Sequence, residues 1–456
     1  MRFRRRRKNK YMKRLILMLL VLVSFSVGYA YLNKSLSIEG TTTVAKTTWN
    51  VRFQNIQVFD NNAIVETAPT LLDNATKVSF AINLDKPGDS YGFTVDVVNS
   101  GTVDAKLSSI SLTDELQNKT NYLDYSLTYI DGVEIQEGDA LKAGEHETIK
   151  FKAYFKKDIT ASDLESDDTV LNLVLTATYS QSDGTEVAVN HPVTCRKATT
   201  LHTETCSRTD SYGCIAKGYA NGDTITYGHT NGTSLVNGQS GGYALDCDVS
   251  GNGDYERFYY VSDLYTGTEN GVDQFDSNYA VLIYHKNIGT AVAYNSAEEN
   301  WHGPVTLLSS LPTRSTWANE NINLKSTSRT IVNEQGAQTT NNDSNTIENP
   351  FNYTDRVARI LTTHEIDKAL GSTSRITSGY LDNAEYLMED SAYSKESGCS
   401  GGACYYWLET PHSSASAYAW SMRGHYRRLS YGSASDAVYC GARPAVEIPK
   451  VNISLK

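Results

Sequence analysis

Residues 248–256 combine side chains of the kind that hold a calcium ion. Oxygen-bearing side chains stand at alternate positions, and Gly253 falls where a calcium loop turns sharply. The five candidate ligands are Asp248, Ser250, Asn252, Asp254 and Glu256. Tyr259 occupies the twelfth position, where such a loop normally has a bidentate Glu. The pattern therefore leaves two interpretations open, a calcium site and a solvated Asn/Gly/Asp turn between two strands.

A second candidate surface lies near the C-terminus, where aromatic and arginine side chains are dense. Trp420, Arg423, Tyr426, Arg427 and Arg428 fall within one short stretch. Trp, Tyr and Arg are enriched at binding hot spots, and a local basic patch in an acidic protein favours an anionic partner. The same residues could instead alternate into a β-rich core. We expect them to bind a surface glycan or protein.

Two further motifs match parts of catalytic sites without completing them. Residues 238–242 read G-Q-S-G-G, so Ser240 matches G-x-S-x-G, but it lies in a polar linker with no adjacent base or oxyanion hole evident. His364 and Glu365 open H-E-I-D-K, which lacks the second histidine of H-E-x-x-H. We expect both on the solvated side of a helix. The sequence therefore contains no complete catalytic motif of a hydrolase or an oxidase, and we expect a non-enzymatic protein.

All seven cysteines lie beyond residue 194, namely Cys195, Cys206, Cys214, Cys247, Cys399, Cys404 and Cys440. In an oxidising compartment this clustering predicts disulfides in the second half of the chain. We expect the first four to pair among themselves, in a connectivity that the sequence leaves open. Cys399 and Cys404 could close a small Gly-rich loop. Because the number is odd, at least one thiol is unpaired or pairs between chains.

The first residues predict export from the cell. Residues 1–14 contain nine Lys or Arg and no acidic residue, and an uncharged apolar run follows over residues 15–32. A basic block before an apolar run directs the following chain outward. Gly28 and Ala30 are small residues suited to signal-peptidase cleavage, while the run is close to the length that spans a bilayer. Residues 1–32 are therefore a signal peptide or a membrane anchor, and the protein is expected at the cell surface or outside the cell.

The charge balance excludes one class of partner. Without residues 1–30 the chain has 32 basic and 52 acidic residues, a net charge of −20. A chain this acidic will not bind nucleic acid non-specifically, because the phosphate backbone is also negative. If the leader is retained, the membrane is its one expected partner besides the surface ligand.

Hydrophobic patterning predicts a mainly β protein with more than one domain. In residues 33–185, apolar side chains alternate over 78–84, 93–97, 125–135, 149–155 and 173–179, which is typical of an antiparallel β-sandwich. Residues 186–240 are polar and contain cysteines, as in a linker. Residues 241–456 are predicted to form an α+β domain, with strands at 258–261 and 279–284. That domain also contains predicted helices over 353–370 and 381–389 and a polar loop over 325–349.

Residues 87–107 resemble the P-G-D…F-x-V-x-V-x-N-x-G-x-x-x-A pattern of bacterial Ig-like surface domains. The basic and apolar leader resembles that of the TasA and camelysin family of surface and matrix-fibre proteins, which places a first strand at about residues 35–44. The resemblance implies an Ig-like sandwich at the cell surface. It also implies an alternative function, a structural subunit of an extracellular matrix or fibre that assembles by strand exchange.

Two short motifs resemble those of an uncharacterised bacterial surface domain with a C-type-lectin-like fold, distantly similar to formylglycine-generating enzymes. Residues 405–411 read Y-Y-W-L-E-T-P where that domain has W-W-L-R-S-P, and residues 441–446 read G-A-R-P-A-V where it has G-V-R-P-A-L. Glu409 thus replaces the usual Arg, and Ala442 replaces Val. We expect Trp407 and Arg443 to be scaffold residues. The resemblance implies a C-type-lectin-like domain that presents a binding, adhesion-type surface.

Overall fold

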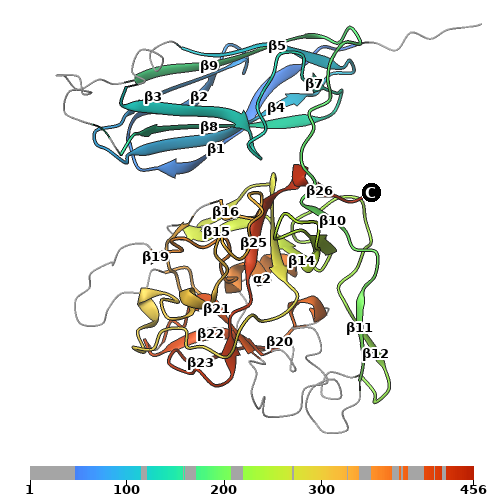
Figure 1. Ribbon diagram of the computed structural model, residues 1–456, viewed down its shortest axis with the longest axis vertical. Helices are drawn as coiled ribbons and strands as arrows, with labels where there is room; N and C mark the ends of the chain where they lie inside the picture. The colour runs from blue at the N-terminus through green and yellow to red at the C-terminus, as the bar shows by residue number, and fades with distance from the viewer. Residues whose placement is uncertain are drawn as a thin grey trace, which may run out of the picture. The chain divides into compact units, whose positions relative to one another are not determined.

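The structure is a computed structural model of the chain. It describes residues 47–456 apart from 114–120, 158, 160–170, 207–218, 270–271, 326, 338–350, 372–378, 382–383, 389–404, 415 and 424–427. Thr48–Lys456 form one compact unit, whose elements are drawn in Figure 1. The prediction of a mainly β protein is confirmed. The predicted leader, residues 1–32, and the strand expected at 35–44 lie outside the described residues.

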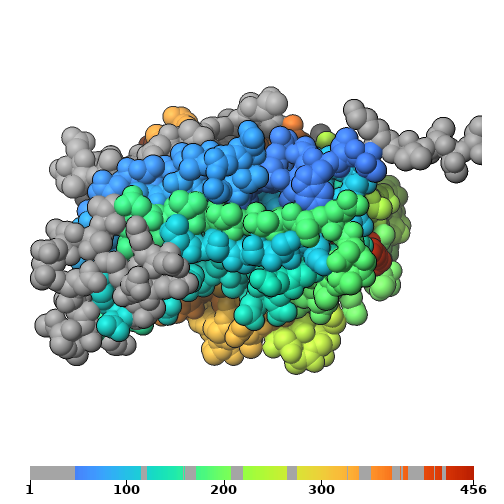
Figure 2. Space-filling model, turned by 90° about the horizontal axis from the view of Figure 1, so that it is seen from above, coloured from blue at the N-terminus to red at the C-terminus, as the bar shows by residue number. Residues whose placement is uncertain are grey.

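Residues 51–181 form two antiparallel sheets, which we call the two-sheet region. In spatial order the first sheet contains β1 (Val51–Asn61), β4 (Ser90–Asn99), β8 (His146–Phe155) and β6 (Leu123–Tyr129). The second contains β2 (Ile64–Leu72), β3 (Lys77–Asn83), β9 (Leu171–Gln181), β5 (Ala105–Leu112) and β7 (Ala140–Leu141). Figure 2 shows side chains from β2 and β3 (blue), β9 (green) and β5 (cyan) side by side. Strands far apart in the sequence are therefore neighbours.

The two sheets share one apolar core, because alternate side chains of their strands point inward. Phe80 of β3 packs edge-on against Phe93 of β4 and Phe151 of β8, with ring centroids 5.0 and 5.1 Å apart. All three side chains are buried. The predicted alternating runs correspond to β3, β4, β6, β8 and β9, although β6 ends at Tyr129 and residues 133–135 form no strand. Gly132, with φ of 86°, lies in the tight turn predicted after Tyr129.

Residues beyond 194, the C-terminal region, contain two larger sheets. In spatial order the six-stranded sheet contains β25 (Ala445–Pro449), β17 (Tyr279–Tyr284), β14 (Glu256–Ser262), β13 (Ala244–Cys247), β10 (Cys195–Lys197) and β26 (Ile453–Ser454). The five-stranded sheet contains β20 (Gly379–Tyr380), β23 (Arg428–Ser433), β22 (Tyr418–Arg423), β21 (Tyr405–Pro411) and β24 (Cys440–Gly441). The strands predicted at 258–261 and 279–284 are confirmed as β14 and β17.

Shorter elements complete the C-terminal region. The paired strands are β11 (His202–Thr205) with β12 (Thr224–Tyr227), β15 (Leu264–Glu269) with β16 (Val272–Phe275), and β18 (Ser328–Arg329) with β19 (Phe351–Asn352). The helical elements are α2 (Thr363–Ala369) and the 3-10 turns η4 (Asn300–His302), η5 (Leu307–Ser310), η6 (Glu385–Leu387) and η8 (Lys450–Asn452).

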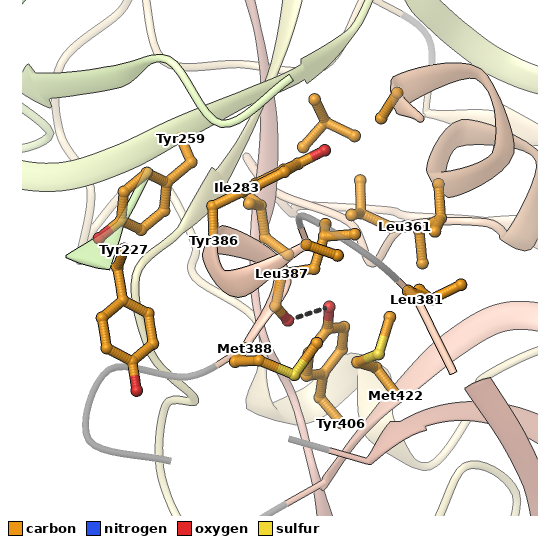
Figure 3. Packing of buried hydrophobic residues seen from close by; sticks show 14 of the residues in the cluster. Tyr227, Tyr259, Ile283, Leu361, Leu381, Tyr386, Leu387, Met388, Tyr406 and Met422 are labelled. Atoms are coloured by element: carbon orange, nitrogen blue, oxygen red, sulfur yellow. Dashed lines mark hydrogen bonds between the residues drawn. The ribbon is translucent and has the colours of Figure 1, made fainter. Parts of the chain in front are cut away.

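One apolar core joins α2 and η6 to both large sheets. It contains Tyr259, Val261, Val281 and Ile283 from the six-stranded sheet, Ile366 and Ala369 from α2, Tyr386 and Leu387 from η6, and Tyr406, Leu408, Met422 and Leu429 from the five-stranded sheet. Figure 3 shows the Tyr406 hydroxyl donating to the Leu387 carbonyl, at 2.8 Å. This bond satisfies the polar end of a buried tyrosine. The core therefore fixes the five-stranded sheet against the rest of the C-terminal region.

The helix predicted over 353–370 is much shorter than expected, because α2 spans only Thr363–Ala369. Asp355 has φ of 60°, in the left-handed region, which ends any regular helix there. Arg359 exchanges two backbone hydrogen bonds with Ala445 and is therefore held in an extended conformation. The helix starts only at Thr362, whose side chain forms a capping box with Glu365. Of the second predicted helix, 381–389, the described residues form only η6, and 382–383 and 389 lie outside them.

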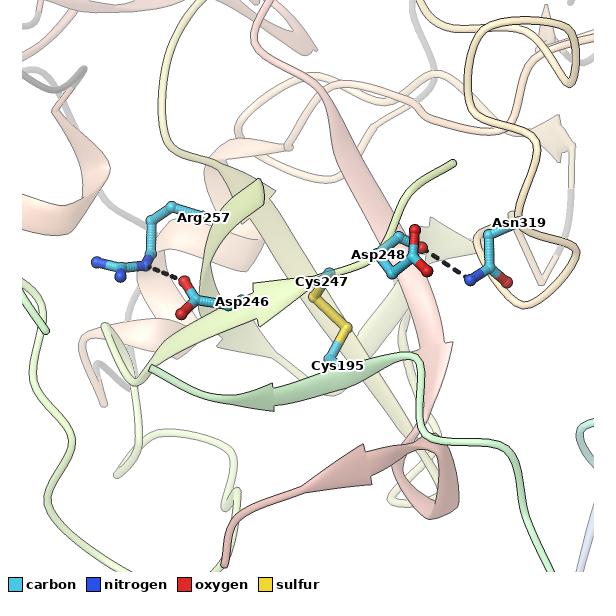
Figure 4. Close-up of a disulfide and its surroundings, with 6 residues drawn as sticks. All are labelled: Cys195, Asp246, Cys247, Asp248, Arg257 and Asn319. Atoms are coloured by element: carbon cyan, nitrogen blue, oxygen red, sulfur yellow. Dashed lines mark hydrogen bonds and ion pairs between the residues drawn. A yellow bond between two sulfur atoms is a disulfide. The ribbon is translucent and has the colours of Figure 1, made fainter. Parts of the chain in front are cut away.

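A disulfide joins β10 to β13 in the six-stranded sheet. Cys195 and Cys247 are cross-strand partners and are bonded to each other, as Figure 4 shows. Cys206 is also disulfide-bonded. Cys440 is a buried free thiol, and burial raises the pKa of this thiol, which keeps it unreactive. The prediction of disulfides in the second half is thus confirmed for Cys195 and Cys247, while Cys214, Cys399 and Cys404 lie outside the described residues.

Within the described part of the chain, no helix is both long and apolar enough to cross a bilayer.

His191 ties the segment after β9 to the two-sheet region. Its ring nitrogens contact Asp131 Oδ2 at 2.8 Å and Glu147 Oε2 at 3.1 Å, and its ring packs edge-on against Tyr129. Burial lowers the pKa of His191, but the hydrogen bonds and charges of both carboxylates outweigh burial and raise it to about 9. The imidazole is therefore a cation held between two anions at neutral pH.

The His191 contacts predict a loss of stability at high pH. A pKa raised in the folded state stabilises the protein fully below the unfolded value of about 6.5, and the effect is lost as pH rises through about 9. We expect His191→Gln to lower the free energy of unfolding by about 2 kcal/mol near neutral pH and by almost nothing above about pH 10. Urea unfolding at several pH values measures this, with His146→Gln as control. A pH-independent difference would contradict the ion-pair explanation.

Candidate functional site

The open end of the β22–β23 hairpin exposes two tyrosines on one face of the five-stranded sheet. Trp420 is the cross-strand partner of Tyr431, and Met422 that of Leu429. Met422, Leu429 and the Trp420 ring point into the core, because side chains alternate along a strand. Tyr418 and Tyr431 continue the same face beyond the core and remain 39% and 43% exposed.

These tyrosines belong to a connected group of rings that we call the aromatic face, consisting of His412, Tyr418, Trp420 and Tyr431. The centroid of Tyr431 lies 4.0 Å from that of His412 and 5.8 Å from those of Trp420 and Tyr418. The Tyr418 and Tyr431 rings are nearly perpendicular, at 87°. Contacts of this kind hold each ring in place. The face is thus an ordered, partly exposed aromatic surface.

Glu334 supports one flank of the aromatic face. Its Oε2 accepts the indole N–H of Trp420 at 3.1 Å and the backbone N–H of Ser413 at 3.0 Å, and its Oε1 accepts the Ser413 hydroxyl. Glu334 lies in a tight turn, which is closed by a hydrogen bond from the Gly336 N–H to the Asn333 carbonyl. Burial raises the pKa of Glu334, but the hydrogen bonds from Ser413 and Trp420 outweigh burial and lower it. Glu334 is therefore ionised at neutral pH.

Glu298 lies beside Ser433 and Ser435. Ser433 is the cross-strand partner of Tyr418, and its hydroxyl donates to Glu298 Oε1 at 3.4 Å, while the Ser435 hydroxyl donates to the same oxygen at 2.5 Å. The carboxylate is exposed. Each of the two carboxylates therefore contacts a residue whose cross-strand partner is Tyr418 or Tyr431.

The structure separates the basic residues predicted to bind ligand from the exposed tyrosines. Arg423 and Arg428 are cross-strand partners at the turn end of the hairpin, whereas Tyr418 lies at the open end. The Arg423 guanidinium lies over the Tyr405 ring, 5.4 Å from its centroid. Trp420 is only 3% exposed, so its neighbours Tyr418 and Tyr431, and not Trp420 itself, face solvent. Tyr426 and Arg427 lie outside the described residues, and a basic binding surface at this end stays a prediction.

The Asp248 loop is closed by its own backbone. Asp248 Oδ1 accepts the N–H groups of Gly251 and Asn252 at 2.7 and 3.2 Å, and its Oδ2 accepts that of Gly253 at 2.9 Å. Asn252 is hydrogen-bonded to Asp254 through both its side-chain atoms. Figure 4 shows the Asp248 carbonyl accepting from Asn319, at 2.7 Å. The loop is therefore a turn in which the Asp248 carboxylate accepts hydrogen bonds from backbone amides.

Glu256, the last candidate ligand of the loop, belongs to β14 and accepts the Tyr284 hydroxyl at 3.0 Å. Among all described residues, no group of three or more His, Cys, Asp or Glu side chains is placed to hold a metal ion. Calcium binding by this loop stays one of two open interpretations, and it would require a rearrangement of the Asp248 contacts.

The two catalytic-looking motifs have structural roles here. The Ser240 hydroxyl accepts the Val236 N–H at 3.0 Å and donates to the Ser234 carbonyl at 3.2 Å, so it stabilises a turn. The expectation that His364 and Glu365 face solvent was wrong, since they are 2% and 0% exposed. Glu365 is turned inward because it caps the helix and pairs with a buried arginine.

The residues of the two C-terminal motifs form scaffold, as expected. Trp407 is fully buried and donates its indole N–H to the Val292 carbonyl at 2.8 Å. Arg443 is fully buried and donates to the carbonyls of Tyr284, Tyr386 and Leu387 at 2.6, 2.9 and 2.6 Å. Glu409 accepts from Arg329 Nε at 3.2 Å and from the Tyr353 hydroxyl at 2.7 Å. A carboxylate is accommodated at this position because a buried arginine neutralises it.

Sequence reasoning found Trp420 but missed the partners that complete the face. Glu334 lies 86 residues from Trp420 and Glu298 lies 135 residues from Ser433 along the chain. Neither carboxylate stands in a motif. The only local indication of the face in the sequence is the alternation of side chains in β22 and β23, which places Tyr418 and Tyr431 on the same face as Trp420.

Compared with known proteins, the chain matches no family model, no curated protein and no solved structure.

The geometry of the Asp248 loop predicts a stability effect independent of calcium. We expect Asp248→Ala to lower the free energy of unfolding by roughly 1–2 kcal/mol, because backbone amides lose their acceptor. We also expect the same melting temperature in chelator and in excess calcium. Differential scanning calorimetry of both proteins in both buffers measures this, with Asp254→Ala as control. A higher melting temperature in calcium, abolished by Asp248→Ala, would instead establish the calcium site.

Proposed function

We propose that this chain is a non-enzymatic protein of the cell surface or extracellular space, which presents a glycan-binding domain. In this proposal the leader exports the chain, and an Ig-like sandwich formed by the two-sheet region carries a C-type-lectin-like domain formed by the C-terminal region. The aromatic face is the proposed binding surface. The exposure of Tyr418 and Tyr431 beside fixed polar groups is the observation that carries the proposal.

The chemistry of the aromatic face suits a sugar. A pyranose presents an apolar C–H surface that packs on an aromatic ring, and its hydroxyls require hydrogen-bond partners nearby. Tyr418 and Tyr431 offer the ring surfaces, and Ser414, Glu298 and the two tyrosine hydroxyls offer polar groups at the margin. Because the rings are held by His412 and Trp420, little conformational freedom is lost on binding.

The proposal predicts that the tyrosines carry binding. We expect Tyr418→Ala combined with Tyr431→Ala to lower the affinity for immobilised hexasaccharides by at least about tenfold, while the melting temperature changes little because both side chains are exposed. Tyr255→Ala, an exposed tyrosine elsewhere, is the matched control. Arg423→Ala with Arg428→Ala tests the basic end of the hairpin. Loss of binding in that arginine variant alone would move the site away from the aromatic face.

A groove in the two-sheet region supports a second candidate, a fibre subunit. It has a volume of about 310 Å³ and is lined by Trp49, Val51 and Phe53 at the start of β1, by Lys77, and by residues 176–179 of β9. Trp49 remains 48% exposed. An apolar groove beside the first residues of β1 is suited to bind an additional extended segment.

An open strand edge adjoins this groove. The pairing of β3 with β9 ends at Lys77 and Thr176, whereas β5 follows the other edge of β9 to Gln181. No strand within the described residues pairs with the β3 side of residues 177–181. In the fibre proposal, residues 35–44 of a second copy pair with this edge.

Assembly distinguishes the two candidates. For a fibre subunit, light scattering of the exported protein should increase with concentration, and deletion of residues 35–44 should abolish the increase. Replacement of this segment by a scrambled sequence of the same composition is the matched control and should also prevent assembly. An exported chain that stays monomeric at every concentration would overturn the fibre proposal.

A further inference from the structure

The aromatic face lies in an acidic environment, which restricts its ligand. Glu334 lies beside Trp420, the cross-strand partner of Tyr431, and Glu298 lies beside Ser433, the cross-strand partner of Tyr418. Glu299 lies next to Glu298 in the chain and pairs with His302 at 3.1 Å. The nearest arginines of this hairpin, Arg423 and Arg428, are at its opposite end.

Of the two carboxylates beside the aromatic face, Glu298 is the more exposed to solvent. Its carboxylate is exposed and accepts from two serine hydroxyls, which leaves lone pairs directed outward, since each ionised carboxylate can accept about four hydrogen bonds. Glu334 is half-buried and already accepts three hydrogen bonds, from Ser413 twice and from Trp420. It therefore contributes a fixed negative charge, whereas Glu298 can also contact a ligand directly.

We infer that the aromatic face binds a glycan that carries free, protonated amino groups, such as a polymer of glucosamine. This inference rests on the proposed function and specifies its ligand. The pyranose rings pack on Tyr418 and Tyr431, an ammonium group on one sugar lies at Glu298, and the negative charge of Glu334 beside Trp420 adds to the attraction. An acidic polysaccharide is excluded from the same face by repulsion from both carboxylates.

Three hexasaccharides of similar shape but different charge test the inference. They are hexamers of glucosamine, of N-acetylglucosamine and of galacturonic acid, titrated into the exported chain at a pH where the sugar amine is protonated. We expect the glucosamine hexamer to bind roughly tenfold more tightly than its acetylated form, since two charged contacts of modest strength add to about this factor. We expect this preference to decline with added salt and the galacturonic acid hexamer not to bind.

Isosteric variants separate the charge from the rings. Glu298→Gln combined with Glu334→Gln removes both charges and retains side chains that accept hydrogen bonds. We expect this variant to lose the preference for glucosamine while its affinity for N-acetylglucosamine stays within about twofold. Tyr418→Ala with Tyr431→Ala should weaken both sugars equally. Circular dichroism and the melting temperature establish that each variant is folded.

The outcomes distinguish the inference from the function on which it rests. Equal binding of acetylated and free-amine hexamers, lost in the tyrosine variant, would overturn the inference and leave the glycan-binding function standing. A preference for glucosamine that survives in the double Gln variant would also overturn it. Absence of binding to every hexasaccharide would overturn the proposed function together with the inference.

Discussion

A buried charge network centred on Arg359 fixes the C-terminal region. The side chain is fully buried, and its guanidinium donates to Glu365 Oε2 at 2.8 Å and through Nε to Glu447 Oε1 at 2.6 Å. Burial lowers the pKa of Arg359, but the charges of Glu365 and Glu447 outweigh burial, raise the pKa and keep the group ionised. An ionised group away from water is tolerated only when its partners are in place, and loss of one partner typically costs about 3–5 kcal/mol. Loss of any one of the three residues would therefore leave an unpaired charge in the interior.

Other parts of the fold depend on this network. Glu365 also caps α2, because it accepts the backbone N–H of Thr362 at 2.8 Å, and Glu447 lies in β25 and accepts the Lys325 N–H at 2.6 Å. Thus one guanidinium joins a helix start, an edge strand of the six-stranded sheet and the loop before β18. The segment that precedes α2 cannot continue the helix, since Arg359 must remain extended to pair with Ala445 and to reach both carboxylates.

The candidate site is built on this fixed frame. Thr363 in α2 donates its backbone N–H to Thr410 at the end of β21, at 3.0 Å, and Glu409 donates its own N–H to the Leu361 carbonyl. Strand β21 therefore has a defined position, and β22 and β23 follow from it through the sheet. The aromatic face stands where these strands extend past the core, which explains why its tyrosines are both ordered and exposed. Rings fixed in this way lose little conformational freedom when a ligand packs on them.

The sequence alone determined the local features of this protein. Alternation over Val78, Phe80 and Ile82 identified a strand whose one face is buried, and the Asp131-Gly132 turn followed from the need for a positive φ. The early basic block and the cysteines beyond residue 194 predicted an exported, disulfide-bonded chain, of which the Cys195–Cys247 bond is confirmed. These features depend on neighbours in the chain, so they can be read from it.

The tertiary structure decided what depends on distant partners. Helical periodicity suggested a helix from residue 353, but strand pairing with Ala445 and the pairing of Arg359 confined it to residues 363–369. His364 and Glu365 had the pattern of a solvated face and are buried, and Arg359, six residues before Glu365, pairs with it in the interior. Glu298 and Glu334 reach the aromatic face from more than 80 residues away. Contacts between residues so far apart arise only when the chain is folded, which is why local pattern could not reveal them.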